Sequence, residues 1–153
     1  TLDRSSAASD VYKRQLLEKK IKRWRKIRMY QAKITGDSLY HTVSEGYGEA
    51  ITLFGKTDQG ETPMSLLVIA LSSCVTMCVQ GFYHRQFKQD KLAISVAASY
   101  EEETFELLVR IDDALDDKKK ADLLAYIGTY CRVKQLLKPE VIVAITLEGQ
   151  PHA

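Results

Sequence analysis

The longest apolar run in the chain, Met64–Val79, is the feature that most constrains its fold. Thr62 is a suitable N-cap for a helix, and Pro63 suits the first helical position, where its missing N–H costs nothing. The run is shorter than a comfortable membrane span and contains four hydroxyl residues, Ser65, Ser72, Ser73 and Thr76. The sequence therefore predicts a buried central helix that continues to about Arg85.

This helix is apolar on nearly every face, so one small sheet is not expected to cover it. Leu67, Leu71 and Val75 form a stripe that we expect to lack sufficient partners within a single chain. Burial of each side chain against a second copy would contribute about 1.5–3 kcal/mol. The pattern therefore predicts a homodimer.

The segments on either side of the helix alternate between apolar and polar residues, as strands do. We expect strands at 28–35 and 39–44 around a turn at 36–38, a short strand at 50–54, a hairpin of 92–100 with 105–111, and a last strand at 141–147. A helix capped by Asp116 or Asp117 and a short helix ending before Pro139 precede the last strand. The predicted fold class is α+β, with antiparallel sheets around a long central apolar helix.

Charge is unevenly distributed along the 153 residues. Residues 1–28 hold ten Lys/Arg and three Asp/Glu, a net +7, and the remaining residues carry a net −5. We interpret 1–28 as a basic leader, disordered or foreign to the domain, and 29–150 as the domain itself, with Met29 a candidate native start. In the alternative interpretation, Leu17, Ile21 and Trp24 form one face of a helix that binds nucleic acid or an anionic membrane.

Three cysteines, Cys74, Cys78 and Cys131, are the candidate chemical groups. Cβ atoms four residues apart on a helix are roughly 5–6 Å from each other, whereas a disulfide needs about 3.5–4.5 Å. Cys74 and Cys78 therefore cannot bond without unwinding the helix. Cys131 is the only distant partner, and helix N–H groups with Arg132 and Lys134 would favour a thiolate there. Inert packing is the alternative for each cysteine.

No metal or cofactor is expected from the spacing of potential ligands. A C-x-x-x-C pair without clustered histidines is a weak zinc motif, and His41, His84 and His152 are scattered. The chain has no CxxC, HExxH or phosphate-binding glycine loop. An odd number of cysteines without a secretory signal ahead of them argues against a secreted disulfide scaffold, and the expected location is the cytoplasm.

The segment GETPMSLLVIALSSC, which ends at Cys74, resembles the central-helix motif of the OsmC/Ohr family. The family's second motif, Cys-Pro-Val followed by Leu and a final strand, is similar to Cys131-Arg132-Val133 with Leu136-Leu137-Lys138. The match extends from about Met29 to Gln150. The resemblance implies an intertwined homodimer with long central helices packed together and active sites at the subunit interface.

The resemblance also implies a bacterial oxidative-stress function. Cys74 would be the peroxidatic cysteine that attacks an organic hydroperoxide, releasing an alcohol and becoming a sulfenic acid. Cys131 would resolve it as a disulfide, which an external dithiol reduces. Cys78 matches no functional position of the family and is interpreted as a packing residue. No nucleic acid or membrane partner is expected.

The chain departs from the peroxidase members at three positions. Met64 stands where they have Glu, no Arg lies between Arg28 and Arg85, and Arg132 replaces the motif proline. The spacing does not select a substitute among Lys33, Lys56, Glu49 and Glu61. These departures favour the alternative function, a non-peroxidatic protein that binds a hydrophobic small molecule in an apolar pocket at the dimer interface.

Overall fold

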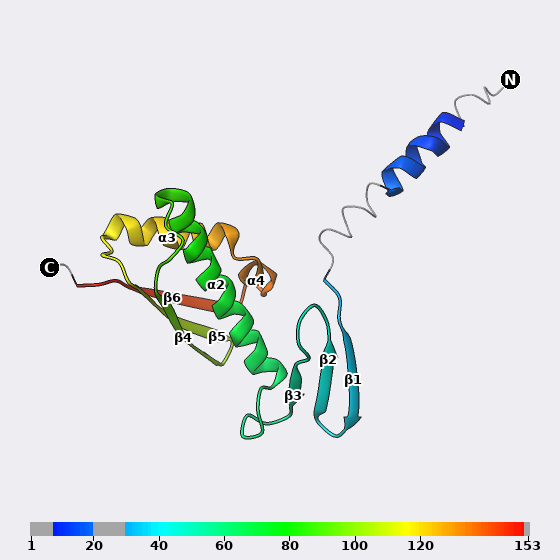
Figure 1. Ribbon diagram of the computed structural model, residues 1–153, viewed down its shortest axis with the longest axis horizontal. Coiled ribbons are helices and arrows are strands. Elements are labelled where there is room, and N and C mark those ends of the chain that lie inside the picture. The colour runs from blue at the N-terminus through cyan, green and yellow to red at the C-terminus, as the bar shows by residue number, and fades with distance from the viewer. Residues whose placement is uncertain (1–7, 20–29, 152–153) are drawn as a thin grey trace. The chain divides into compact units, whose positions relative to one another are not determined.

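The computed structural model describes residues 8–19 and 30–151 (Figure 1). The chain divides into two compact units, residues 1–52 and 53–153. In the first unit, residues 8–19 are helical and their side chains are exposed. Ile21 and Trp24 of the expected leader helix lie outside the described residues.

The first unit also contains the hairpin of β1 (Lys33–Ser38) and β2 (His41–Glu45), which pair antiparallel. β3 (Thr52–Phe54) follows in the sequence and spans the boundary between the two units. The expected turn at residues 36–38 was wrong, because Tyr40 adopts a left-handed conformation with φ 54° and the chain reverses at Leu39–Tyr40. An irregularity of register between Thr35 and Ser38 lets β1 run past the glycine that suggested a turn.

The second unit begins with the central helix α2 (Pro63–Phe87), whose predicted start is confirmed. Thr62 Oγ1 accepts a 3.1 Å hydrogen bond from the Ser65 N–H, and Ser65 Oγ accepts a 2.7 Å bond from the Thr62 N–H. This reciprocal capping box satisfies two N–H groups that would otherwise lack partners. The helix ends at Lys88, which is left-handed with φ 54°.

The second sheet is formed by β4 (Ile94–Glu101), β5 (Thr104–Ile111) and β6 (Ile142–Glu148). The predicted β4–β5 hairpin is confirmed, with Glu102 and Glu103 at positive φ in its turn. β6, however, runs parallel to β5, so this sheet is mixed rather than purely antiparallel. The reason is the crossover between them, which contains α3 (Asp117–Tyr130) and α4 (Arg132–Leu136) and returns the chain to the starting edge of β5.

One face of this sheet packs against α2 and α3 to form the core (Figure 1). The alternation predicted for β5 is confirmed by four side chains that are buried on the same face, Phe105, Leu107, Val109 and Ile111. Asp116 caps α3 by accepting a 2.7 Å hydrogen bond from the Lys119 N–H. It is one of the two residues predicted to cap this helix. The mixed α+β class with a long central helix is confirmed.

Leu71 and Val75 are fully buried within a single chain, so the expectation that they need a second copy was wrong. The core of the second unit covers this stripe because α3 packs on α2 beside the sheet. Ile69 and Met77 are instead 44% and 66% exposed on α2.

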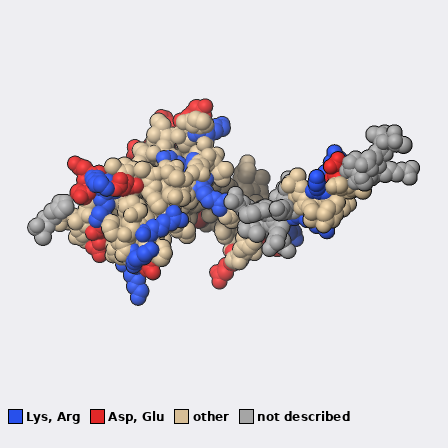
Figure 2. Space-filling view, turned by 90° about the horizontal axis from the view of Figure 1, so that it is seen from above, with Lys and Arg blue, Asp and Glu red and all other residues tan. Residues whose placement is uncertain are grey.

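By length and composition α2 is apolar enough to cross a membrane. Six of its side chains, from Leu71 to Tyr83, are buried in the core of the second unit. Figure 2 shows Lys and Arg side chains interspersed with Asp and Glu side chains over one face of the described residues.

Candidate redox site

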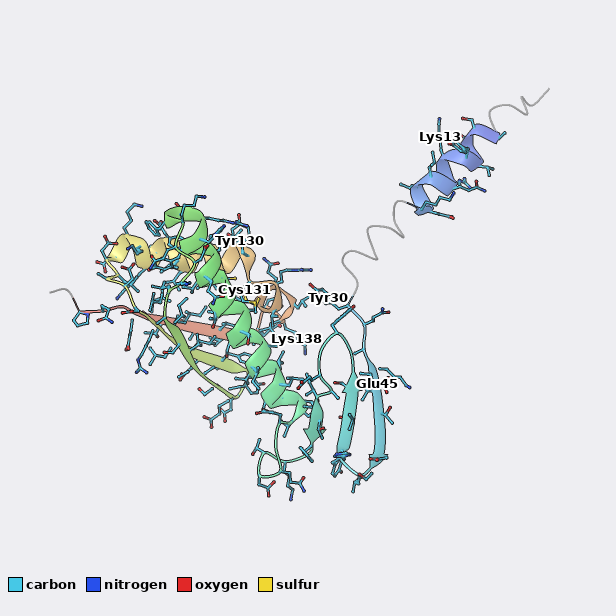
Figure 3. The ribbon with its side chains drawn as sticks, viewed as in Figure 1. Lys13, Tyr30, Glu45, Tyr130, Cys131 and Lys138 are labelled. Atoms are coloured by element: carbon cyan, nitrogen blue, oxygen red, sulfur yellow. The ribbon has the colours of Figure 1, made fainter. Side chains whose placement is uncertain are left out.

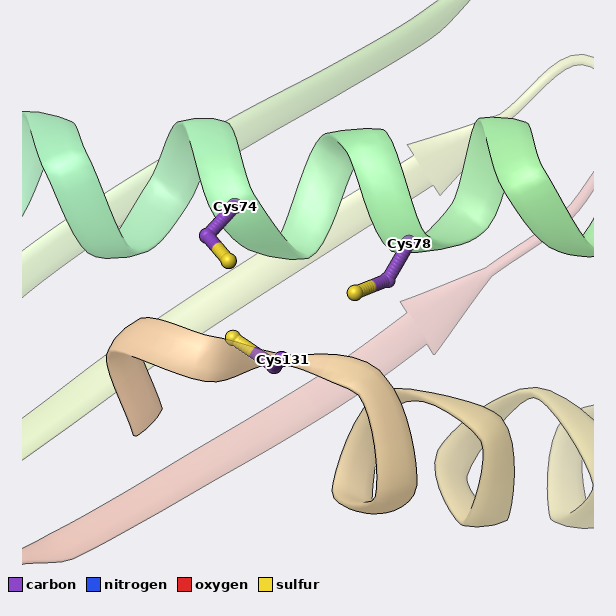
Figure 4. A group of neighbouring side chains, drawn as sticks. All are labelled: Cys74, Cys78 and Cys131. Atoms are coloured by element: carbon purple, nitrogen blue, oxygen red, sulfur yellow. The ribbon is translucent and has the colours of Figure 1, made fainter. Parts of the chain in front are cut away.

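The fold brings all three cysteines together (Figure 4). Two come from α2, and Cys131, labelled in Figure 3, comes from the junction of α3 with α4. Cys74 and Cys78 lie one turn apart on α2, and their side chains project toward Cys131. The three Sγ atoms all lie within 4.8 Å of one another. The sulfur of Cys131 therefore lies close to both cysteines of α2.

Cys131 is held at this position by the two helices that it joins. Its N–H donates a 2.9 Å hydrogen bond to the carbonyl of Ile127 at the end of α3, and its carbonyl accepts a 3.2 Å bond from the N–H of Gln135 in α4. The side chain is fully buried, beside the fully buried Leu123 and Ile127 in the same core. The backbone thus fixes the direction from which this sulfur approaches α2.

Access from solvent differs among the three thiols. Cys131 is 0% exposed and Cys78 is 7% exposed, whereas Cys74 is only partly buried. Cys74 is therefore the most accessible of the three cysteines.

Burial also determines the acidity of the two inner thiols. It raises the pKa of Cys78 to about 12, and the nearby Cys131 and Cys74 add to the shift. Burial raises the pKa of Cys131 as well, and the backbone N–H of Lys134 offsets only part of this rise. The expectation that the start of α4 would favour a thiolate at Cys131 was therefore wrong, because desolvation outweighs the helix N–H groups.

The inclusion of Cys78 in the cluster was missed by the sequence interpretation. The signal was present, because residues four apart lie on one face of a helix. A sulfur that approaches Cys74 from the opposing element therefore also approaches Cys78.

The residues considered as substitutes for the missing family Glu and Arg do not lie on the elements that carry the cysteines. Glu61 accepts a 2.6 Å hydrogen bond from Ser65 Oγ at the start of α2. Lys56 lies in the loop before α2, and Lys33 and Glu49 belong to the first unit.

A cavity of about 390 Å³ opens beside the first turns of α2 and the end of β4. Its lining includes Met64, Val68 and Tyr100. Met64 precedes Cys74 by ten residues, which corresponds to about 15 Å along a helix axis. Met64 therefore does not contact Cys74 of its own chain.

The family model for OsmC-like proteins matches residues 55–146, more than half of the chain, and includes all three cysteines. The chain belongs to the OsmC-like family. The resemblance seen in the two cysteine motifs is thus confirmed. No curated protein sequence matches this OsmC-like protein significantly.

Solved structures share the fold of this OsmC-like protein. The organic hydroperoxide resistance protein OhrB of Bacillus subtilis is 17% identical, with a TM-score of 0.56 over 78% of this chain and 99% of that one. An OsmC-like protein from Mycoplasma pneumoniae is 13% identical, with a TM-score of 0.59 over 79% and 95%. A hypothetical protein from Aquifex aeolicus VF5 is 19% identical, with a TM-score of 0.64 over 80% and 96%.

Proposed function

We propose that this OsmC-like protein is a thiol-dependent peroxidase that reduces organic hydroperoxides through Cys74 and Cys131. The observation that carries the proposal is the placement of a buried Cys131 sulfur within 4.8 Å of the sulfur of the partly buried Cys74. One thiol is accessible to a substrate, and the other is protected from it and positioned to form a disulfide.

The chemistry balances in three steps. The Cys74 thiolate attacks a peroxide oxygen and breaks the O–O bond, which leaves a sulfenic acid and, after protonation, an alcohol. The Cys131 thiol then attacks the sulfur of Cys74 and releases water as the disulfide forms. An external dithiol reduces this disulfide in two exchange steps and becomes oxidised itself. The raised pKa of Cys131 makes the second step the one most dependent on a local proton acceptor.

The proposal includes a homodimer. It is supported by Ile69 and Met77, which leave apolar surface exposed along α2 at 44% and 66% of their areas. Because Met64 is about 15 Å along the helix from Cys74, only a second copy could bring this end of a helix to the thiol. The redox cycle with an external dithiol suits a reducing compartment, so we place the protein in the bacterial cytoplasm.

Consumption of cumene hydroperoxide in the presence of a dithiol tests the peroxidase proposal. The wild-type protein should turn over, Cys74→Ser should not, and Cys78→Ser should retain most of the rate. We expect slow turnover, because Met64 cannot accept a hydrogen bond as a Glu would. If wild type and Cys74→Ser consume peroxide equally slowly, the peroxidase proposal fails.

The alternative function is binding of a hydrophobic small molecule without peroxide chemistry. The cavity of about 390 Å³ favours it, because Met64, Val68 and Ile69 contribute apolar lining. A hydrophobic fluorescent probe should then bind wild type and Cys74→Ser with equal affinity. Its binding to Met64→Glu should be much weaker, because the substitution places a charge in the apolar lining.

A further inference from the structure

The proposed redox cycle uses Cys74 and Cys131 but not Cys78. With the sulfur of Cys78 included, the cluster could bind one ion through three sulfurs. Cys78 lies within 4.8 Å of both Cys74 and Cys131, so three thiols converge on one point (Figure 4). An ion bound by three sulfurs at about 2.3 Å needs them roughly 3.5–4 Å apart, depending on whether the centre is pyramidal or planar. Small side-chain rotations bring the cluster into that range.

Three sulfur ligands favour a soft ion that is stable with three-coordinate binding. Thiolates prefer soft ions over Mg²⁺ or Ca²⁺, which take oxygen ligands. The described part of the chain adds no His, Asp or Glu to this group, so it offers no fourth protein ligand. Structural zinc sites almost always have four ligands, which disfavours zinc here.

The net charge of the complex distinguishes among the remaining soft ions. Three thiolates carry −3, so a bound Cu(I) leaves −2 and a bound Zn(II) leaves −1, whereas a trivalent centre leaves no net charge. Cys78 and Cys131 are buried, and no charged side chain is buried among the described residues. A net negative complex would therefore lack a buried counter-charge, and burial of such an ion is costly.

We propose that the reduced cluster of Cys74, Cys78 and Cys131 binds trivalent arsenic, taken up as arsenite. In the reaction, As(OH)3 exchanges its three As–O bonds for three As–S bonds. The three thiol protons leave with the three hydroxyl groups as water. No electrons are transferred, and the product is neutral. Cys74 provides the entry point, because it is the most accessible of the three sulfurs.

This binding would compete with peroxide reduction, a consequence that rests on the proposed function. Arsenic bound to three sulfurs occupies the nucleophile Cys74, so it should block hydroperoxide consumption. Conversely, a Cys74–Cys131 disulfide leaves Cys78 as the only free ligand and should prevent arsenite uptake. The inference assigns Cys78 a role beyond packing and revises the expectation that the chain has no site for a metal or metalloid.

Arsenite titration of the reduced full-length protein tests the proposal. We expect one arsenic per protomer, loss of three free thiols, and three As–S bonds by X-ray absorption spectroscopy. Cys78→Ser should lower the affinity at least tenfold, while Ser73→Ala, which changes an exposed residue of the same helix, should not. Because the spectrum is measured on wild type, a folding defect in a variant does not affect it.

Three results would overturn the proposal. These are two rather than three As–S bonds, equal arsenite affinity of wild type and Cys78→Ser, and tighter binding of Cu(I) or Zn(II) than of arsenite in direct competition. Failure of the peroxidase proposal would be recognised separately. It would appear as no cumene hydroperoxide consumption by arsenite-free wild type, whatever the arsenic titration gives.

Discussion

The sulfur of Cys131, at the start of α4, lies within 4.8 Å of the sulfur of Cys74 in the middle of α2. Neither helix brings its cysteine to this point alone. α2 is positioned by its packing on the sheet, and Cys131 by the junction of α3 with α4 over the same core. A disulfide between these residues would link two elements that already pack together.

One equivalent of organic hydroperoxide per protomer should therefore produce an intramolecular Cys74–Cys131 disulfide. Peptide mapping by mass spectrometry without reduction would identify it. Cys131→Ser should stop at the sulfenic acid or proceed to overoxidised Cys74, and Cys78→Ala should still form the disulfide and lose only packing. Recovery of Cys74 and Cys131 in reduced form after peroxide treatment would rule out the mechanism.

The order in which the thiols react with iodoacetamide should follow their burial. Burial raises the pKa of Cys78 to about 12, so its thiol stays protonated at pH 8. Cys131 is fully buried and its pKa is also raised. Timed alkylation at pH 8 with peptide mapping should show Cys74 modified first, and Cys78 and Cys131 only later. Modification of Cys78 as fast as Cys74 would contradict the burial of the cluster.

Local sequence signals predicted most elements of the second unit. Thr62 and Pro63 marked the start of α2, and the alternation in β5 identified its buried face, because these signals act between residues close in sequence. The parallel pairing of β6 and the acidity of Cys131 were not predicted. Both depend on how distant elements pack, since the crossover sets the strand direction and the surrounding core desolvates the thiol.

The same reasoning explains the outcome for the candidate site. The two motifs identified Cys74 and Cys131 as a pair. Whether Cys78 also lies near Cys131 depends on where the start of α4 packs against α2, which the motifs do not specify. Leu71 and Val75 show the converse error. Their apolar stripe was read as an interface, whereas α3 and the sheet cover it within one chain.

A homodimer should depend on the apolar side chains that α2 leaves exposed. Met77 is 66% exposed, and complete burial of such a side chain contributes about 1.5–3 kcal/mol. Met77→Glu should therefore weaken association at least tenfold, whereas Met77→Leu should preserve it. Sedimentation velocity at micromolar concentrations would measure both. A stable wild-type monomer at these concentrations would exclude the dimer.

A chain that begins at Met29 should retain its folding and any activity. Among the described residues, the buried core side chains lie between Leu71 and Leu147, and those of residues 8–19 are exposed. Soluble yield, thermal unfolding and hydroperoxide consumption should match those of the full chain. Loss of soluble protein on removal of residues 1–28 would show that this segment contributes to the fold. Salt-dependent nucleic-acid binding that disappears on removal would instead indicate a binding function for it.

Asp113 should make a measurable contribution to stability, because it links α2, the loop after β5 and α3. The Tyr83 hydroxyl donates a 2.7 Å hydrogen bond to Asp113 Oδ2, and Lys119 Nζ donates a 2.8 Å bond to the same oxygen. Burial alone would raise the pKa of Asp113, but the bonds from Lys119 and Tyr83 outweigh it and hold the pKa below its ordinary value. The carboxylate is therefore favoured by the folded state.

The sign of the pH dependence follows from this lowered pKa. The stabilisation is fully present above the unfolded pKa of about 3.9 and is lost as the pH falls through the lower folded value. Asp113→Asn should lower the free energy of unfolding by about 1–2 kcal/mol at pH 7, an amount reduced by partial solvent exposure. The deficit should shrink toward pH 3. Asp122→Asn, which breaks an exposed 2.9 Å ion pair with Lys118, should cost less than Asp113→Asn at pH 7. Urea denaturation of both variants between pH 3 and pH 7 measures these differences, and equal effects of the two substitutions would contradict the role of Asp113.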